Sequence, residues 1–74
     1  MGTETKTISI GGESIALGSF VKLAGAAGTG GEAKHVVQAG MVKVNGAVEA
    51  RRGHKVKAGD VVEVEGRGRF VVGH

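Results

Sequence analysis

The chain has 74 residues, 15 of them glycine, and a net charge of +3 at pH 7, with no cysteine, tyrosine or tryptophan. A chain of this length buries only a thin core, which argues against a deep, walled active-site pocket, and the lack of cysteine excludes disulfides and thiolate-bound zinc. Because its two phenylalanines are its only aromatic residues, it offers few rings on which unpaired bases could stack.

The first part of the chain predicts a strand and then a helix. Residues 5–10 alternate in character as a short strand does, and two glycines follow them. From Leu17 onward, apolar residues recur at i, i+3, i+4 and i+7, which predicts an amphipathic helix over 15–24. Ser14 is the expected N-terminal cap of this helix, and Gly25 is its expected stop.

A second helix is predicted from Thr29 to Gly40. Thr29 and Glu32 have the spacing of a capping box, in which a hydroxyl and a carboxylate satisfy free N–H groups at a helix start. Ala33, Val36 and Val37 form its buried stripe, and Gly40 supplies a left-handed residue at its end. Since few residues join the two helices, we expect them to pack against each other.

The remainder of the chain predicts short strands and tight turns. Asn45-Gly46 is a strong hairpin signal between strands at 42–44 and 47–50. Residues 51–54 form a polar connection, residues 57–60 a second turn, and strands are expected at 61–65 and 69–72. An apolar final strand at 70–72 could pair with a second copy if it lay at a sheet edge. The order predicts one α+β domain over residues 1–74, with two packed helices followed by a small, mainly antiparallel sheet.

Positive charge is concentrated in the middle of the chain. Residues 34–57 carry six lysines or arginines against Glu49 alone, whereas each flanking part carries two basic and three acidic residues. A clustered basic surface is the usual footprint of a polyanionic partner. A solvated face that only maintains solubility is the competing interpretation, and for Lys22, outside the block, it is as strong as binding.

Several segments together resemble the S4 RNA-binding domain family. They are residues 40–46 (GMVKVNG), preceded by 32–34 (EAK) and followed by 56–60 (VKAGD). The resemblance covers residues 15–66. Residues 17–23 (LGSFVKL), 30–34 (GGEAK) and 49–53 (EARRG) make the chain most similar to the small stand-alone YbcJ-like S4 proteins.

The resemblance implies an αL-type fold in which the helix pair and the following hairpin hold structured RNA, of the ribosomal or transfer RNA class, through its phosphates. Because few flat side chains are available and the deep groove of A-form RNA is closed to side chains, recognition should be led by shape. Arg51 and Arg52 are the best candidates for forked phosphate contacts. The full set of expected RNA-binding residues is Lys22, Lys34, His35, Gln38, Lys43, Arg51, Arg52, Lys55 and Lys57.

One position departs from the family pattern. Many S4 domains carry an arginine at the start of the second helix, where this chain has Gly30. A direct contact from that position is lost. The bare helix start would instead let a phosphate approach its N–H groups.

The sequence argues against several other functions. The glycine-rich residues 28–31 follow a helix and lack the Gly-Lys-Ser/Thr ending of a nucleotide loop. The three histidines have no metal-ligand spacing, and no catalytic set of side chains is recognisable, so we expect no enzyme activity, metal, cofactor or small-molecule substrate. With no apolar run near the ~20 residues of a membrane span and no signal-peptide pattern at the start, a cytoplasmic location is expected.

Two alternatives to RNA binding stay open. In the first, the basic face docks an acidic partner such as a ribosome-associated protein. The second is duplex DNA binding, which is disfavoured because neither helix presents the Arg, Asn or Gln set that reads base edges in the major groove.

Overall fold

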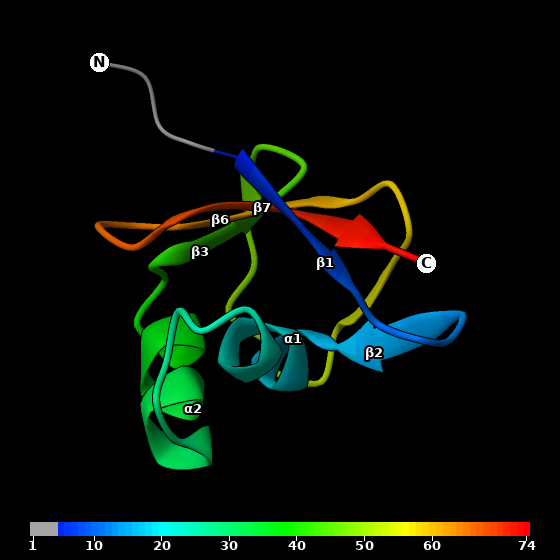
Figure 1. Ribbon diagram of the computed structural model, residues 1–74. Helices are drawn as coiled ribbons and strands as arrows, with labels where there is room; N and C mark the ends of the chain where they lie inside the picture. The colour runs from blue at the N-terminus through cyan, green and yellow to red at the C-terminus, as the bar shows by residue number, and fades with distance from the viewer. Residues whose placement is uncertain (1–4) are drawn as a thin grey trace.

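The computed structural model describes residues 5–74, which form two helices and seven short strands (Figure 1). In chain order these elements are β1 (Thr5–Ser9), β2 (Ser14–Ala16), α1 (Leu17–Leu23), α2 (Gly30–Gln38), β3 (Val42–Val44), β4 (Ala47–Val48), β5 (Lys55–Lys57), β6 (Val61–Val64) and β7 (Gly68–Gly73). The predicted α+β class, with two helices ahead of the hairpin and most strands, is confirmed.

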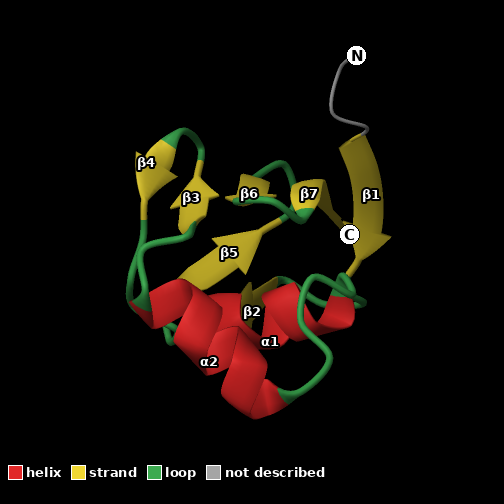
Figure 2. Ribbon diagram, turned by 90° about the vertical axis from the view of Figure 1, so that its left-hand side faces the viewer, coloured by secondary structure: helices red, strands yellow, loops and turns green. Residues whose placement is uncertain are grey.

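The elements form two layers joined by a small connecting ribbon. Five strands make one sheet in the order β1-β7-β6-β3-β4, in which β1 runs parallel to β7 and the other neighbours are antiparallel. Both helices lie on one side of this sheet, and the antiparallel pair of β2 and β5 lies between the layers (Figure 2). Within residues 5–74, the opposite face of the sheet carries no helix (Figure 2).

The core fills the space between the helices and the sheet. Leu17, Phe20 and Val21 of α1 are fully buried, and the predicted stripe of Ala33, Val36 and Val37 on α2 is buried with them. The strands contribute alternate residues to the same cluster, as expected for a sheet covered on one face. These strand residues are Val42, Val44, Val56, Val62, Val64, Phe70 and Val72.

The start of the first helix differs from the prediction. Residues Ser14–Ala16 form β2 and pair with β5, so α1 begins at Leu17 and Ser14 is not its cap. Ala16 occupies the cap position without a side-chain hydrogen bond. Instead, the N–H groups of Leu17 and Gly18 donate to backbone carbonyls from residues 52–54. A partner far along the chain replaces the local cap, so local sequence patterns could not reveal it.

The second helix has the predicted ends. The Thr29 hydroxyl accepts a hydrogen bond from the Glu32 N–H at 3.1 Å, whereas the Glu32 carboxylate accepts one from Gly28 rather than from Thr29. Gly40 has φ of +76°, and the N–H groups of Gly40 and Met41 donate to the carbonyls of the last turn. This closed C-terminal arrangement needs a residue that tolerates positive φ.

The Asn45-Gly46 hairpin is confirmed, with φ of 52° and 87° at its two turn residues. Its return strand, β4, is shorter than predicted and spans only Ala47–Val48. The final strand is not a free edge, because β7 is paired on one side with β1 and on the other with β6. The edge position considered for residues 70–72 from the sequence is therefore wrong.

Candidate functional site

A groove of about 480 Å³ opens where α1, the start of α2 and the segment after β4 meet. Its basic side chains are Lys22 from α1, Lys34 from α2 and Arg52 from that segment. The other lining residues, Ala16, Gly18, Ser19, Gly30 and Gly53, have small side chains, and no acidic residue of the described range 5–74 lines the groove. Three separate elements thus bring positive charge to one hollow.

The three cations have no intramolecular counter-charge. Lys22, Lys34 and Arg52 are exposed, and none of them forms an ion pair or side-chain hydrogen bond with another residue of the described range 5–74. An unpaired cation keeps its full electrostatic attraction for an incoming anion, and two or three such cations around one hollow reinforce each other. The groove is therefore suited to a phosphate-bearing ligand.

Segment 49–54 determines one wall of the groove. The N–H of Leu17 donates to the carbonyl of His54 at 2.7 Å, and the N–H of Gly18 donates to the carbonyl of Arg52 at 2.9 Å. A Cβ atom on Gly18 would lie 3.2 Å from the Arg52 Cβ, which is a tight contact. Glycine at position 18 thus lets this segment lie close against the helix.

Arg51, next to Arg52, has a different environment. Its Nε and Nη2 atoms donate to the Glu49 carboxylate at 2.9 and 3.2 Å, a forked pairing that uses the geometry a phosphate would need. These bonds, with one from the Arg51 backbone N–H, lower the pKa of Glu49 to about 2. The two arginines, which the sequence presents as equivalent, are therefore not equivalent in the fold.

The other predicted binding residues are all exposed, but they do not share one surface. Lys55 pairs in register with Ala16, at the edge of the groove, and Gln38 lies one turn beyond Lys34 on α2. His35 is also exposed on α2, but it does not line the groove. The Nζ atom of Lys57, the last residue of β5, lies 3.8 Å from the carboxylate of Asp60 in the turn before β6.

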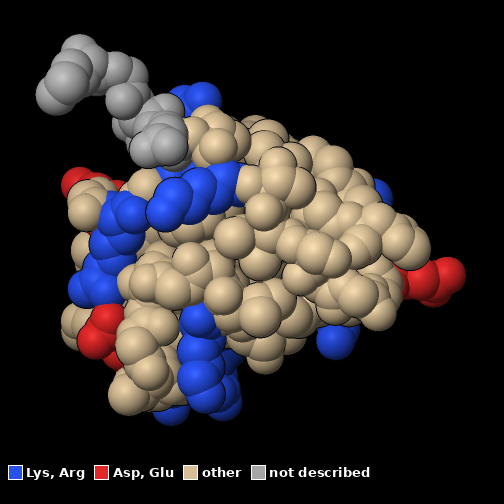
Figure 3. Space-filling model, in the orientation of Figure 1, with Lys and Arg blue, Asp and Glu red and all other residues tan. Residues whose placement is uncertain are grey.

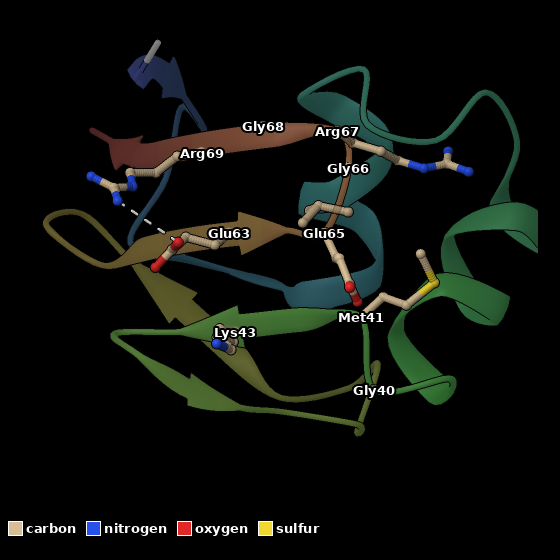
Figure 4. A pocket seen from close by; sticks show the side chains of 10 residues that line it. Gly40, Met41, Lys43, Glu63, Glu65, Gly66, Arg67, Gly68 and Arg69 are labelled. Atoms are coloured by element: carbon tan, nitrogen blue, oxygen red, sulfur yellow. Dashed lines mark ion pairs between the residues drawn. The ribbon is translucent and has the colours of Figure 1, made fainter. Parts of the chain in front are cut away.

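Lys43 belongs to a different hollow, of about 550 Å³, at the sheet (Figure 4). Here Glu63 and Glu65 lie among Lys43, Arg67 and Arg69, and the Arg69 guanidinium is 3.8 Å from the Glu63 carboxylate. Lys43 itself faces Glu63 across the β3–β6 pair. Figure 3 likewise shows lysines and arginines in more than one region of the surface, with acidic groups beside some of them.

Two features of the site are absent from the sequence interpretation. Ser19 and Gly53 line the groove without carrying a recognisable signal of their own. Arg67 donates to the Ala26 carbonyl at 2.7 Å and pairs with Glu32, whose pKa is lowered chiefly by this bond. It thereby ties the β6–β7 turn to the loop between the helices, a contact too distant in the chain to be read from local patterns.

Residues 5–74 contain no cluster of metal-ligating side chains. No group of three or more His, Cys, Asp or Glu side chains there is placed to hold a metal ion. Neither helix in that range is long and apolar enough to cross a membrane.

Comparison with known proteins gives concordant matches. Residues 8–72 match the S4 domain family. The chain is 49% identical over 65 residues to a probable ribosome maturation protein, RlbA, of Bacillus subtilis, covering 88% of this chain and 92% of that protein. It is 34% identical over 64 residues to a tyrosine–tRNA ligase of Burkholderia lata, covering 86% of this chain but only 16% of the ligase.

Proposed function

The chain belongs to the S4 domain family, and from this premise we propose that it binds structured RNA, without catalysing a reaction, through the groove formed by α1, α2 and segment 49–54. The observation that carries the proposal is the convergence of Lys22, Lys34 and Arg52 on a hollow without acidic residues. Phosphates are the ligands that such a set attracts, and guanidinium and ammonium groups bind them through charge-assisted hydrogen bonds.

Structured RNA suits this surface better than single strands. Both phenylalanines are buried, so no phenylalanine, tyrosine or tryptophan ring of residues 5–74 is exposed for base stacking. The groove instead offers cations and backbone close to small residues, which can follow a folded phosphate path and its 2′-hydroxyls. We therefore expect recognition of shape, with Lys55 and Gln38 extending the contact beyond the groove.

The relatives narrow the class of RNA that we propose. One is named for ribosome maturation and is matched over nearly its whole length, and the other is a transfer RNA ligase matched over a small part. Ribosomal RNA is therefore our first candidate and transfer RNA the second. A role on ribosomal RNA also agrees with the cytoplasmic location expected from the sequence.

The test is a fluorescence-anisotropy titration of a folded ribosomal RNA fragment and a duplex DNA of equal length. Wild type is compared with Lys22→Ala/Lys34→Ala/Arg52→Ala and with a control, Lys6→Ala/Lys43→Ala/Arg69→Ala, which loses the same charge from the sheet. We expect RNA to bind more tightly than DNA. The groove variant should lose about 100-fold in affinity, because it removes two or three charge-assisted contacts to phosphates. The control variant should stay within about threefold of wild type.

Salt dependence provides a second readout of the same titration. With three to five phosphate contacts, log K should fall with log salt at a slope of roughly −2 to −4.5. Equal affinity for RNA and DNA, or equal losses in both variants, would contradict the proposal. In that case the alternative of an acidic, ribosome-associated protein partner would be tested by co-purification after nuclease treatment.

A further inference from the structure

Glu49 is the one acidic residue between positions 34 and 57, and it lies in the segment that supplies Arg52 to the groove. A carboxylate beside a phosphate-binding surface should repel the ligand, at a cost that grows as the site becomes less hydrated. Yet the side chain of Glu49 is only 15% exposed, compared with 78% for that of Arg51. This carboxylate faces into the segment rather than toward solvent.

Residues of its own segment surround the carboxylate of Glu49 and donate hydrogen bonds to it. One oxygen accepts from the Arg51 backbone N–H at 3.1 Å and from Arg51 Nε at 2.9 Å. The other accepts from Arg51 Nη2 at 3.2 Å and lies 3.4 Å from His54 Nδ1. Backbone and side-chain groups on both sides of Arg52 are therefore gathered around one side chain.

The same segment is attached to α1 at two further points. The carbonyls of Arg52 and His54 accept hydrogen bonds from the first N–H groups of that helix, and the His54 N–H donates to the Arg51 carbonyl within the turn. The backbone of Arg52 is thus bonded to the helix, its chain neighbour Arg51 is bonded to Glu49, and Arg52 itself lines the groove.

We propose that Glu49 is a positioning residue, which folds segment 49–54 around itself and so holds Arg52 in the groove beside Lys22 and Lys34. This inference rests on the proposed RNA-binding function and adds to it an acidic residue that strengthens the binding of a polyanion. Arg51 acts with it, as the cation that neutralises Glu49, and does not contact the RNA as a primary ligand.

The proposal makes a prediction opposite in sign to that of simple electrostatics. Removal of one negative charge from a basic surface should tighten RNA binding if only charge matters. If Glu49 positions Arg52, Glu49→Ala should instead weaken binding about tenfold, because one charge-assisted contact is lost. The salt slope should fall in magnitude by about 0.7 to 0.9, the amount expected for one phosphate contact.

The experiment measures RNA affinity and salt slope for Glu49→Ala, Glu49→Gln and the control Glu65→Ala, which removes one exposed acid at the sheet. Glu49→Gln should retain affinity within about threefold of wild type, since its amide oxygen can still accept from the Arg51 N–H. Glu65→Ala should be unchanged or slightly tighter. Glu49→Ala combined with Arg52→Ala should bind no more weakly than Arg52→Ala alone, whereas Glu49→Ala and Lys34→Ala should be additive.

The outcomes separate this inference from the function on which it rests. If wild type binds RNA and Arg52→Ala weakens binding, but Glu49→Ala binds as tightly as wild type or more tightly, the positioning role is wrong and RNA binding stands. If wild type does not bind folded RNA, the proposed function itself fails. Circular dichroism and thermal unfolding of each variant confirm that the fold is retained. If Glu49→Ala is unfolded, the shorter Glu49→Asp provides the test, with an intermediate loss of affinity expected and unchanged affinity contradicting the proposal.

Discussion

The helix side and the sheet side of this protein carry similar numbers of cations but differ in what surrounds them. In the groove, the described part of the chain places no acidic residue beside Lys22, Lys34 and Arg52. In the hollow at the sheet, Lys43, Arg67 and Arg69 lie among Glu63 and Glu65. The sheet cations are thus balanced locally, while the groove cations are free to bind an external anion. The arrangement of counter-charges, more than the net charge, distinguishes a binding surface from a solvated one.

Among single substitutions, the largest effect is expected when the groove is given an acidic residue like those at the sheet. Ser19 lines the groove and is exposed, so Ser19→Glu should place a carboxylate among its three cations. RNA affinity should fall by about 30-fold or more through neutralisation and repulsion of the phosphates. The matched control is Thr7→Glu, which adds the same charge to an exposed residue of β1 and should change affinity by less than about threefold.

Anisotropy titration measures both variants at low and moderate salt. Equal losses for Ser19→Glu and Thr7→Glu would indicate that total charge, rather than the groove, controls binding. A stability measurement in urea is the accompanying check, because an exposed serine substitution should alter the free energy of unfolding by no more than about 0.5 kcal/mol.

A smaller effect should separate the two neighbouring arginines. Arg52→Ala should weaken RNA binding about tenfold, since it removes an unpaired guanidinium from the groove. Arg51→Ala should weaken it by a lesser factor, about threefold, through the loosened Glu49 cluster rather than through a lost phosphate contact. The salt slope should decrease for Arg52→Ala more than for Arg51→Ala. A larger loss of affinity for Arg51→Ala than for Arg52→Ala would show that Arg51 leaves Glu49 and contacts the RNA directly.

The smallest effect is expected when the sheet hollow loses its acidic residues. Glu63→Gln/Glu65→Gln leaves Lys43 and Arg69 with fewer counter-charges, so this surface becomes electrostatically more like the groove. RNA affinity should rise by no more than about twofold to threefold, through general attraction, with little change at high salt. A gain of tenfold or more would mean that the sheet face can bind RNA once it is freed, and that shape contributes little to the choice of surface.

Much of the fold was predictable because its signals are local. The recurrence of apolar residues every three or four positions predicted the helix stripes, Thr29 and Gly40 marked the ends of α2, and Asn45-Gly46 marked the hairpin. The β2–β5 pair was not predictable, since three residues are too few to display a period. The parallel pairing of β1 with β7 was missed for another reason, because it joins opposite ends of the chain and follows from tertiary packing.

The candidate site was predictable as a composition but not as an arrangement. The basic block contains Lys34 and Arg52, and the exposed face of the first helix contains Lys22, all three of which line the groove. The sequence could not reveal that Lys43 lies at a different hollow or that the Arg51 guanidinium is bonded to the Glu49 carboxylate. Both facts depend on which strands and turns meet in space. Lysines and arginines that look equivalent in the sequence therefore differ in the fold, because some have acidic neighbours and others do not.

The most direct test of the account is a nuclear magnetic resonance titration of the isotopically labelled protein with a folded ribosomal RNA fragment. The account predicts that amide shifts change at the groove, in residues 16–22, 30–34 and 52–55, with little change at Lys43, Glu63 and Arg69. Changes concentrated at the sheet residues, or spread evenly over all exposed lysines and arginines, would contradict the central claim that the uncompensated groove is the RNA-binding surface.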